Sequence, residues 1–98
     1  MKRSERQQIK QEIRNATQSL LGEIITDLRN KADLSQEDLA YESGVNRSFM
    51  SKIERGHTAV TLLTLMRLAK TLGVKISDII IELERRMEEA KQELPEDE

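Results

Sequence analysis

The stretch from Leu34 to Gly56, LSQEDLAYESGVNRSFMSKIERG, constrains the fold of this chain more than any other. Ser35 is a residue type that caps the start of a helix, and Asp38 three residues later is a capping-box-like acid. Gly44 then ends this first helix, because glycine readily adopts the left-handed backbone that a sharp helix exit requires. Asn46 caps a second helix, which runs to the end of the stretch. The pattern therefore predicts two short helices joined by a tight turn.

Apolar and small residues fall on one side of each expected helix. They are Leu39, Ala40 and Ser43 in the first helix, Val45 in the turn, and Met50 and Ile53 in the second. Because this side would pack against the body, the opposite side of the second helix stands clear of it. The side chains expected on that outer side are Arg47, Ser48, Ser51, Lys52 and Arg55.

The same stretch resembles the helix-turn-helix of the Cro and phage-repressor type, found in the large XRE-like family of bacterial regulators. The residues that carry the resemblance are Gln36, Ala40, Gly44, Val45, Met50 and the closing Ile53, Glu54, Arg55 and Gly56. The similarity extends from about Ile24 to Ile80, a little over half of the chain. It implies an all-α fold, a five-helix phage-repressor-like DNA-binding domain, here with helical N- and C-terminal extensions.

The resemblance implies that the first exposed residues of the second helix read DNA bases. These are Arg47 and Ser48, with Ser51 and Lys52 one turn later. An arginine can donate two parallel hydrogen bonds to guanine, which discriminates against other bases by roughly 1–3 kcal/mol. The alternative from the residues alone is a solvated polar face, which any surface helix can show.

Other residues around the motif are candidates for contacts with DNA phosphates. In the family, the glutamine that matches Gln36 bonds a phosphate. The remaining candidates could offer side chains or backbone amides on either side of it, and they are Asn46, Arg55, His57, Thr58 and Thr61. The resemblance also implies a structural ion pair between Arg29 and Glu54, which would hold the first helix to the third. The alternative is two unrelated surface charges.

Apolar spacing predicts helices on both sides of the motif. The helix before it carries Leu20, Leu21, Ile24, Ile25 and Leu28, and the helix after it, capped by Thr61, contributes Leu62, Leu65, Leu68, Ala69 and Leu72 to the core. We therefore expect a polar N-terminal extension over residues 1–17 and a DNA-binding domain over 18–81, with the motif at 34–56. A C-terminal helix extension and acidic tail would occupy 82–98, with Pro95 stopping the helix.

The last helix has an apolar pattern that one small core does not require. Its apolar residues recur at gaps of four and three from Ile76 through Ile80, Leu83, Met87 and Ala90 to Leu94, which is heptad spacing. We interpret Ile76, Ile79, Ile80, Leu83 and Met87 as a dimer interface, or as a surface that the N-terminal stripe Ile9, Ile13 and Ala16 covers. The alternative is a long terminal helix that only completes the core.

Residues 1–17 allow three interpretations. Their composition permits either a frayed, partly helical leader or an ordered helix, because they contain neither glycine nor proline. Their five basic residues could also form an arm along DNA, and they are Lys2, Arg3, Arg6, Lys10 and Arg14.

Charge and composition narrow the function further. The net charge of −2 argues at first against nucleic acid, but residues 1–81 hold 13 basic and 10 acidic residues, whereas residues 82–98 hold 3 and 8. An acidic tail thus masks a mildly basic body, and the local field is what DNA meets. The chain lacks cysteine and any apolar run of membrane-spanning length, so we expect a cytoplasmic protein with no membrane association, no thiolate metal site and no cofactor.

These observations predict a sequence-specific DNA-binding transcriptional regulator. One such motif reads few base pairs, so we expect a homodimer, acting as a repressor or other regulator on an inverted-repeat operator in double-stranded DNA. The alternative is a protein-interaction module, such as an antitoxin, whose terminal helices bind a partner protein. No nucleophile–base pair or phosphate-cradling glycine loop is present, and His57 lacks partners, so we do not expect an enzyme.

Overall fold

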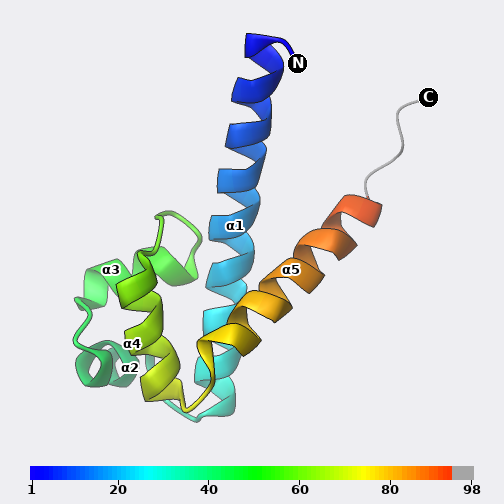
Figure 1. Ribbon diagram of the computed structural model, residues 1–98. Coiled ribbons are helices and arrows are strands. Elements are labelled where there is room, and N and C mark those ends of the chain that lie inside the picture. The colour runs from blue at the N-terminus through cyan, green and yellow to red at the C-terminus, as the bar shows by residue number, and fades with distance from the viewer. Residues whose placement is uncertain (94–98) are drawn as a thin grey trace.

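The computed structural model describes residues 1–93, which form five helices and no strand. The helices are α1 (Arg3–Lys31), α2 (Gln36–Ser43), α3 (Arg47–Glu54), α4 (Leu62–Leu72) and α5 (Ile76–Glu93) (Figure 1). The predicted all-α, five-helix fold is confirmed. Our predictions for Leu94, Pro95 and the acidic tail concern residues outside the described part of the chain.

Short polar side chains start the three helices of the central region, as predicted. Ser35 Oγ accepts a hydrogen bond from the Asp38 amide at 2.9 Å, and Thr61 Oγ1 accepts one from the Thr64 amide at 3.1 Å. Asn46 Oδ1 accepts two, from the second and third residues of α3. At the other end of α2, Gly44 has φ +73°, a left-handed conformation that costs glycine little. Local hydrogen bonding therefore fixes where α2, α3 and α4 begin.

The core draws on all five helices. Its most deeply buried large side chains are Ile25, Leu39, Met50, Ile53, Leu68 and Ile79. Leu62 was predicted to belong to this core, and that prediction is wrong, since its side chain is 67% exposed. The physical reason is that α4 begins at Leu62, whereas its core-facing side begins one turn later at Leu65. Leu63 and Met66 are exposed on the same helix.

Helix α1 is much longer than the domain it belongs to. It runs without a break through position 17, so the first residues form an ordered helix rather than a frayed leader. Residues 1–15 are all exposed, and Figure 1 shows this half of α1 standing free above the remaining helices. The radius of gyration is 14.9 Å, compared with about 12–13 Å for a compact domain of this length. The projecting half of α1 makes the molecule elongated.

Helix α5 packs on the core with residues that the sequence analysis assigned to a dimer interface. Ile79 is only 1% exposed, and Leu83 is also buried, whereas Ile80 and Ile81 are exposed. The side that packs on the core runs through Ile76, Ile79, Leu83 and Met87. The prediction that Ile79 and Leu83 form a dimer interface is therefore wrong, because the core of their own chain already covers them. Of the N-terminal stripe, Ile13 and Ala16 line an open groove opposite Met87 and Ala90.

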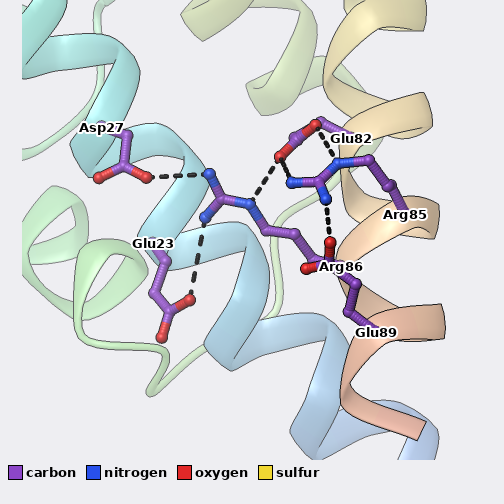
Figure 2. A network of polar contacts seen from close by, with 6 residues as sticks. All are labelled: Glu23, Asp27, Glu82, Arg85, Arg86 and Glu89. Atoms are coloured by element: carbon purple, nitrogen blue, oxygen red, sulfur yellow. Dashed lines mark hydrogen bonds and ion pairs between the residues drawn. The ribbon is translucent and has the colours of Figure 1, made fainter. Parts of the chain in front are cut away.

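A network of charged residues joins α5 to α1 (Figure 2). Arg86 Nη2 donates to Asp27 Oδ2 of α1 at 2.9 Å, and Arg86 Nη1 lies 3.9 Å from Glu23 Oε2. Glu82 Oε1 accepts from Arg86 Nε at 2.9 Å and from Arg85 Nη2 at 2.7 Å, and Arg85 also pairs with Glu89. The network therefore orients Arg86 toward α1 and connects the middle of α5 to the C-terminal half of α1.

Candidate nucleic-acid interface

The outer side of α3 and the start of α2 together form one open depression on the surface. It is lined by Gln36 from α2 and by Arg47, Ser48, Ser51, Lys52 and Arg55 from α3 and its end. The structure thus brings together all four candidates for base contacts and two candidates for phosphate contacts. The apolar side of α3 lies opposite, where Met50 and Ile53 are fully buried.

The remaining phosphate candidates lie around this depression rather than in it. Asn46 is exposed, and its Oδ1 caps α3, while its side-chain Nδ2 can donate to a phosphate. The Thr61 hydroxyl accepts from the Thr64 amide and donates to Thr64 Oγ1, so it is already bonded. His57 is exposed in the loop after α3, and Thr58 lines a separate groove against α1.

Arg29 and Glu54 hold the end of α3 against α1. Arg29 Nε donates to Glu54 Oε2 at 2.8 Å, and Arg29 Nη2 donates to Glu54 Oε1 at 3.0 Å. Thr26 Oγ1 lies 3.1 Å from the same Oε1, and Arg29 Nη1 also donates to the Leu34 carbonyl. The Glu54 side chain is 6% exposed. Arg29 and Glu54 are thus joined by two hydrogen bonds, and each makes a further contact, so neither charge is left unpaired. This pairing fixes the orientation of α3.

Two glycines allow α1 and α3 to approach closely, and our reading of the sequence missed one of them. A Cβ at Gly22 would lie 2.5 Å from the carbonyl oxygen of Ile53 and 2.7 Å from that of Glu54. A Cβ at Gly56 would lie 2.8 Å from the Cα of Ser19, and Gly56 also has φ +73°. Gly22 lies inside a helix, where glycine is unfavourable. Its presence there could have indicated from the sequence that another part of the chain packs closely against this position.

The exposed side of α3 is suited to binding a polyanion. Arg47, Lys52 and Arg55 present cationic donors there, and the serines between them are small enough to let a base edge approach. The nearest acid on the helix itself, Glu54, is turned away and neutralised by Arg29. The arrangement offers hydrogen-bond donors along the exposed side of α3 rather than inside an enclosed cavity, and an exposed helix of this kind fits the major groove of B-form DNA.

Comparisons with known proteins agree with this geometry. A family model described as "Helix-turn-helix" matches residues 25–79. The control protein C.BamHI of Bacillus amyloliquefaciens is 36% identical over 67 residues, which cover 67% of this chain and 83% of that protein. Among solved structures, the restriction-modification controller C.AhdI of Aeromonas hydrophila is 36% identical with a TM-score of 0.59, covering 60% of this chain and 89% of its own. The clp gene regulator ClgR of Corynebacterium glutamicum is 30% identical with a TM-score of 0.70, covering 82% of each chain.

None of the helices within residues 1–93 has the length and apolar character needed to cross a membrane.

Proposed function

The chain belongs to the XRE-like helix-turn-helix family of DNA-binding transcriptional regulators, and from this membership we propose that it binds an inverted-repeat operator as a homodimer. Each copy inserts α3 into the major groove of one half-site. Arg47, Ser48, Ser51 and Lys52 contact base edges, while Gln36 and Arg55 bind phosphates on either side of the groove. Further phosphate contacts come from Asn46, His57 and Thr58, and from Thr61 through its backbone.

The observation that carries this proposal is the convergence of six polar side chains on one face. Gln36 belongs to a different helix from the other five, yet it lines the same depression. An ordinary solvated face of α3 would not require a polar side chain from α2 to lie beside it. In a helix-turn-helix, contacts to phosphates position the protein on the duplex, and contacts to base edges read the sequence. The six side chains offer candidates for both kinds of contact, with phosphate candidates on two helices and base candidates between them.

The proposed dimer interface lies on the exposed side of α5. Ile80 and Ile81 are large apolar residues open to solvent, and Ile76 lies one turn before Ile80. Met87 lies nearer the groove against α1. Exposed apolar residues grouped on one helix favour association with another surface, and binding to two half-sites one turn of DNA apart requires two copies of α3 about 34 Å apart.

Selection of bound sites from random duplex DNA tests the proposal directly. The wild-type protein should enrich an inverted repeat. Arg47→Ala should relax the preference at one position of each half-site by roughly 1–3 kcal/mol. Arg55→Ala should instead weaken binding to every sequence alike and lower the slope of log affinity against log salt by about 0.9 per half-site.

Lys70→Ala on α4 serves as the control, because it removes one exposed positive charge that lines a different groove, between α2 and α4. An Arg47→Ala variant that keeps the wild-type preference at every position would show that another side chain reads the bases. A wild-type protein with no salt-dependent binding to any duplex would favour the other function that we considered, a module that binds a partner protein.

A further inference from the structure

The projecting half of α1 carries its positive charge as a stripe. Arg3, Arg6, Lys10 and Arg14 follow one another at gaps of three, four and four residues, so they share one side of the helix. The acids of this half lie elsewhere. Glu5 and Glu12 each come two residues after a member of the stripe, which at 3.6 residues per turn places them on nearly the opposite side. We call the four basic residues the α1 stripe.

The α1 stripe is costly to the isolated protein. Each neighbouring pair places like charges three or four residues apart, which destabilises a helix by about 0.2–0.5 kcal/mol per pair. Positive side chains near a helix N-terminus also oppose the helix dipole. Within residues 1–93, none of the four makes an ion pair, and all are exposed. An external polyanion would remove both penalties at once.

The α1 stripe lies on the same side of α1 as the residues that contact the loop after α3. Arg14 lines a groove with Thr58, Ala59 and Val60 of that loop, and Thr17 lines it too. Lys10 and Arg3 lie seven and fourteen residues before Thr17, and residues seven apart return to almost the same side of a helix. The loop itself begins where Gly56 packs on Ser19. The loop therefore joins two regions of positive charge, because Arg55 precedes it in the chain and Arg14 lines the groove beside it, from which the stripe continues along the free half of α1.

We propose that the α1 stripe is a second DNA-binding surface, which holds the phosphates of the duplex that flanks the bases read by α3. The inference rests on the proposed function, because α3 must first place the duplex beside the loop. Arg14 lies eleven positions after Arg3 in the helix, a rise of about 17 Å, which matches about five base pairs of B-form DNA. The contacts carry no sequence information, so they lengthen the bound region without changing the operator's sequence.

The test compares two lengths of one duplex, the inverted repeat recovered by selection with the wild-type protein. The short duplex ends about two base pairs beyond the repeat, and the long one extends about ten base pairs further on each side. The stripe variant carries Arg6→Gln, Lys10→Gln and Arg14→Gln. A matched control carries Arg67→Gln, Lys70→Gln and Lys75→Gln, which remove the same number of exposed positive charges from α4 and the turn after it.

We expect the wild type and the control to bind the long duplex more tightly than the short one, and the stripe variant to bind both alike. Three lost phosphate contacts per copy should lower the salt slope on the long duplex by about 2–3 for each copy bound. Base preference should be unchanged. Circular dichroism should show at least wild-type helix content, because the substitutions remove like-charge repulsion.

Three results would overturn the inference. An unchanged salt slope and length dependence in the stripe variant, with normal operator binding by the wild type, would remove the inference and leave the proposed function intact. Loss of dimers by the stripe variant in sedimentation would assign the stripe to a second copy of the chain, whose α5 is acidic. A wild-type protein that binds neither duplex would overturn the proposed function, and the inference with it.

Discussion

At the scale of single residues, α3 is positioned by groups that never face its outer side. Arg29 and Glu54 pair on the inner side, and Gly22 supplies the space in which the end of α3 lies against α1. These residues act on DNA only through the orientation of the helix that carries Arg47. A change at any of them should therefore alter stability and binding together, whereas a change at Arg47 should alter binding alone.

Gly22 offers a sharp prediction, because helix propensity and packing oppose each other there. Replacing a mid-helix glycine by alanine favours the helix by up to about 1 kcal/mol. A Cβ that would lie 2.5 Å from a backbone carbonyl cannot be accommodated without moving α3. Overpacking of this kind costs about 1–3 kcal/mol, so Gly22→Ala should destabilise the protein on balance, as measured by urea denaturation.

Asn15→Ala in the exposed half of α1 is the control, and it should leave stability unchanged or slightly raised. If Gly22→Ala raised the urea midpoint as Asn15→Ala does, the close approach of α1 and α3 would not restrain the fold. If it lowered the midpoint but left DNA affinity intact, the position of α3 would not depend on that approach.

Residues that act within a few positions of the chain could be predicted from the sequence. Ser35, Asn46 and Thr61 are capping types placed directly before helical patterns, and the structure confirms each as a cap. Gly22 could not be explained in this way, because the atoms that require its small size belong to Ile53 and Glu54, about thirty residues away. Sequence patterns describe local geometry well and distant contacts only where a family motif includes them.

At the scale of elements, α5 is attached to α1 by charge as well as by packing. Glu82 accepts hydrogen bonds from Arg85 and Arg86, and Arg86 reaches Asp27 on α1 (Figure 2). The hydrogen bond from Arg85, followed by that from Arg86, lowers the pKa of Glu82 from its ordinary value of 4.5 to about 2. The same bonds raise the pKa values of both arginines, with the Glu82 hydrogen bond as the largest cause.

This lowered pKa predicts how stability depends on pH. Because Glu82 has a lower pKa in the folded state than in the unfolded state, its contribution is complete above about pH 4.5 and is lost as the pH falls toward about 2. Glu82→Gln should therefore lower the thermal midpoint at pH 7 and make little difference near pH 2. The exposed Glu84, which makes no ion pair in the described residues, gives the matched variant Glu84→Gln.

Thermal unfolding followed by circular dichroism at pH 7, 4 and 2 would check this. Glu84→Gln should have a small effect of similar size at each pH. A Glu82→Gln variant that is as stable as the wild type at pH 7 would show that solvent screens the network completely, a common outcome for exposed ion pairs. High salt at pH 7 should reduce the difference between Glu82→Gln and the wild type.

The sequence predicted that α5 is a helix but not which of its sides meets the core. The run Ile79, Ile80 and Ile81 makes the first turns apolar almost all round, so the periodic pattern fits two registers. Packing against α1 and α4 selects the register that buries Ile79 and Leu83. The choice depends on the shape of the cavity left by the other four helices, and a heptad count carries no information about that shape.

At the scale of the whole molecule, exposed apolar residues gather on α1, where they are Ile9 and Ile13, and in two further groups on α4 and α5. The α5 group is Ile80 and Ile81, and the α4 group is Leu62, Leu63 and Met66. Only the α5 group belongs to the proposed dimer interface. The α4 group therefore provides an internal comparison, since its residues are also apolar and exposed.

The dimer prediction can be tested with changes that leave the core untouched. Ile81 is 62% exposed and Leu63 is 61% exposed, so a lysine at either position can extend into water without a loss of core packing. In sedimentation, Ile81→Lys should shift the protein toward monomers, because a twofold interface would bring two introduced charges close together. Leu63→Lys should leave the dimer intact.

Affinity of Ile81→Lys for the full inverted repeat should fall in parallel with its dimerisation. A single half-site requires one copy only, so Ile81→Lys should bind it as tightly as the wild type does. A monomeric Leu63→Lys variant with a dimeric Ile81→Lys variant would place the interface on α4 instead, and α4 would then set the spacing between the two copies of α3.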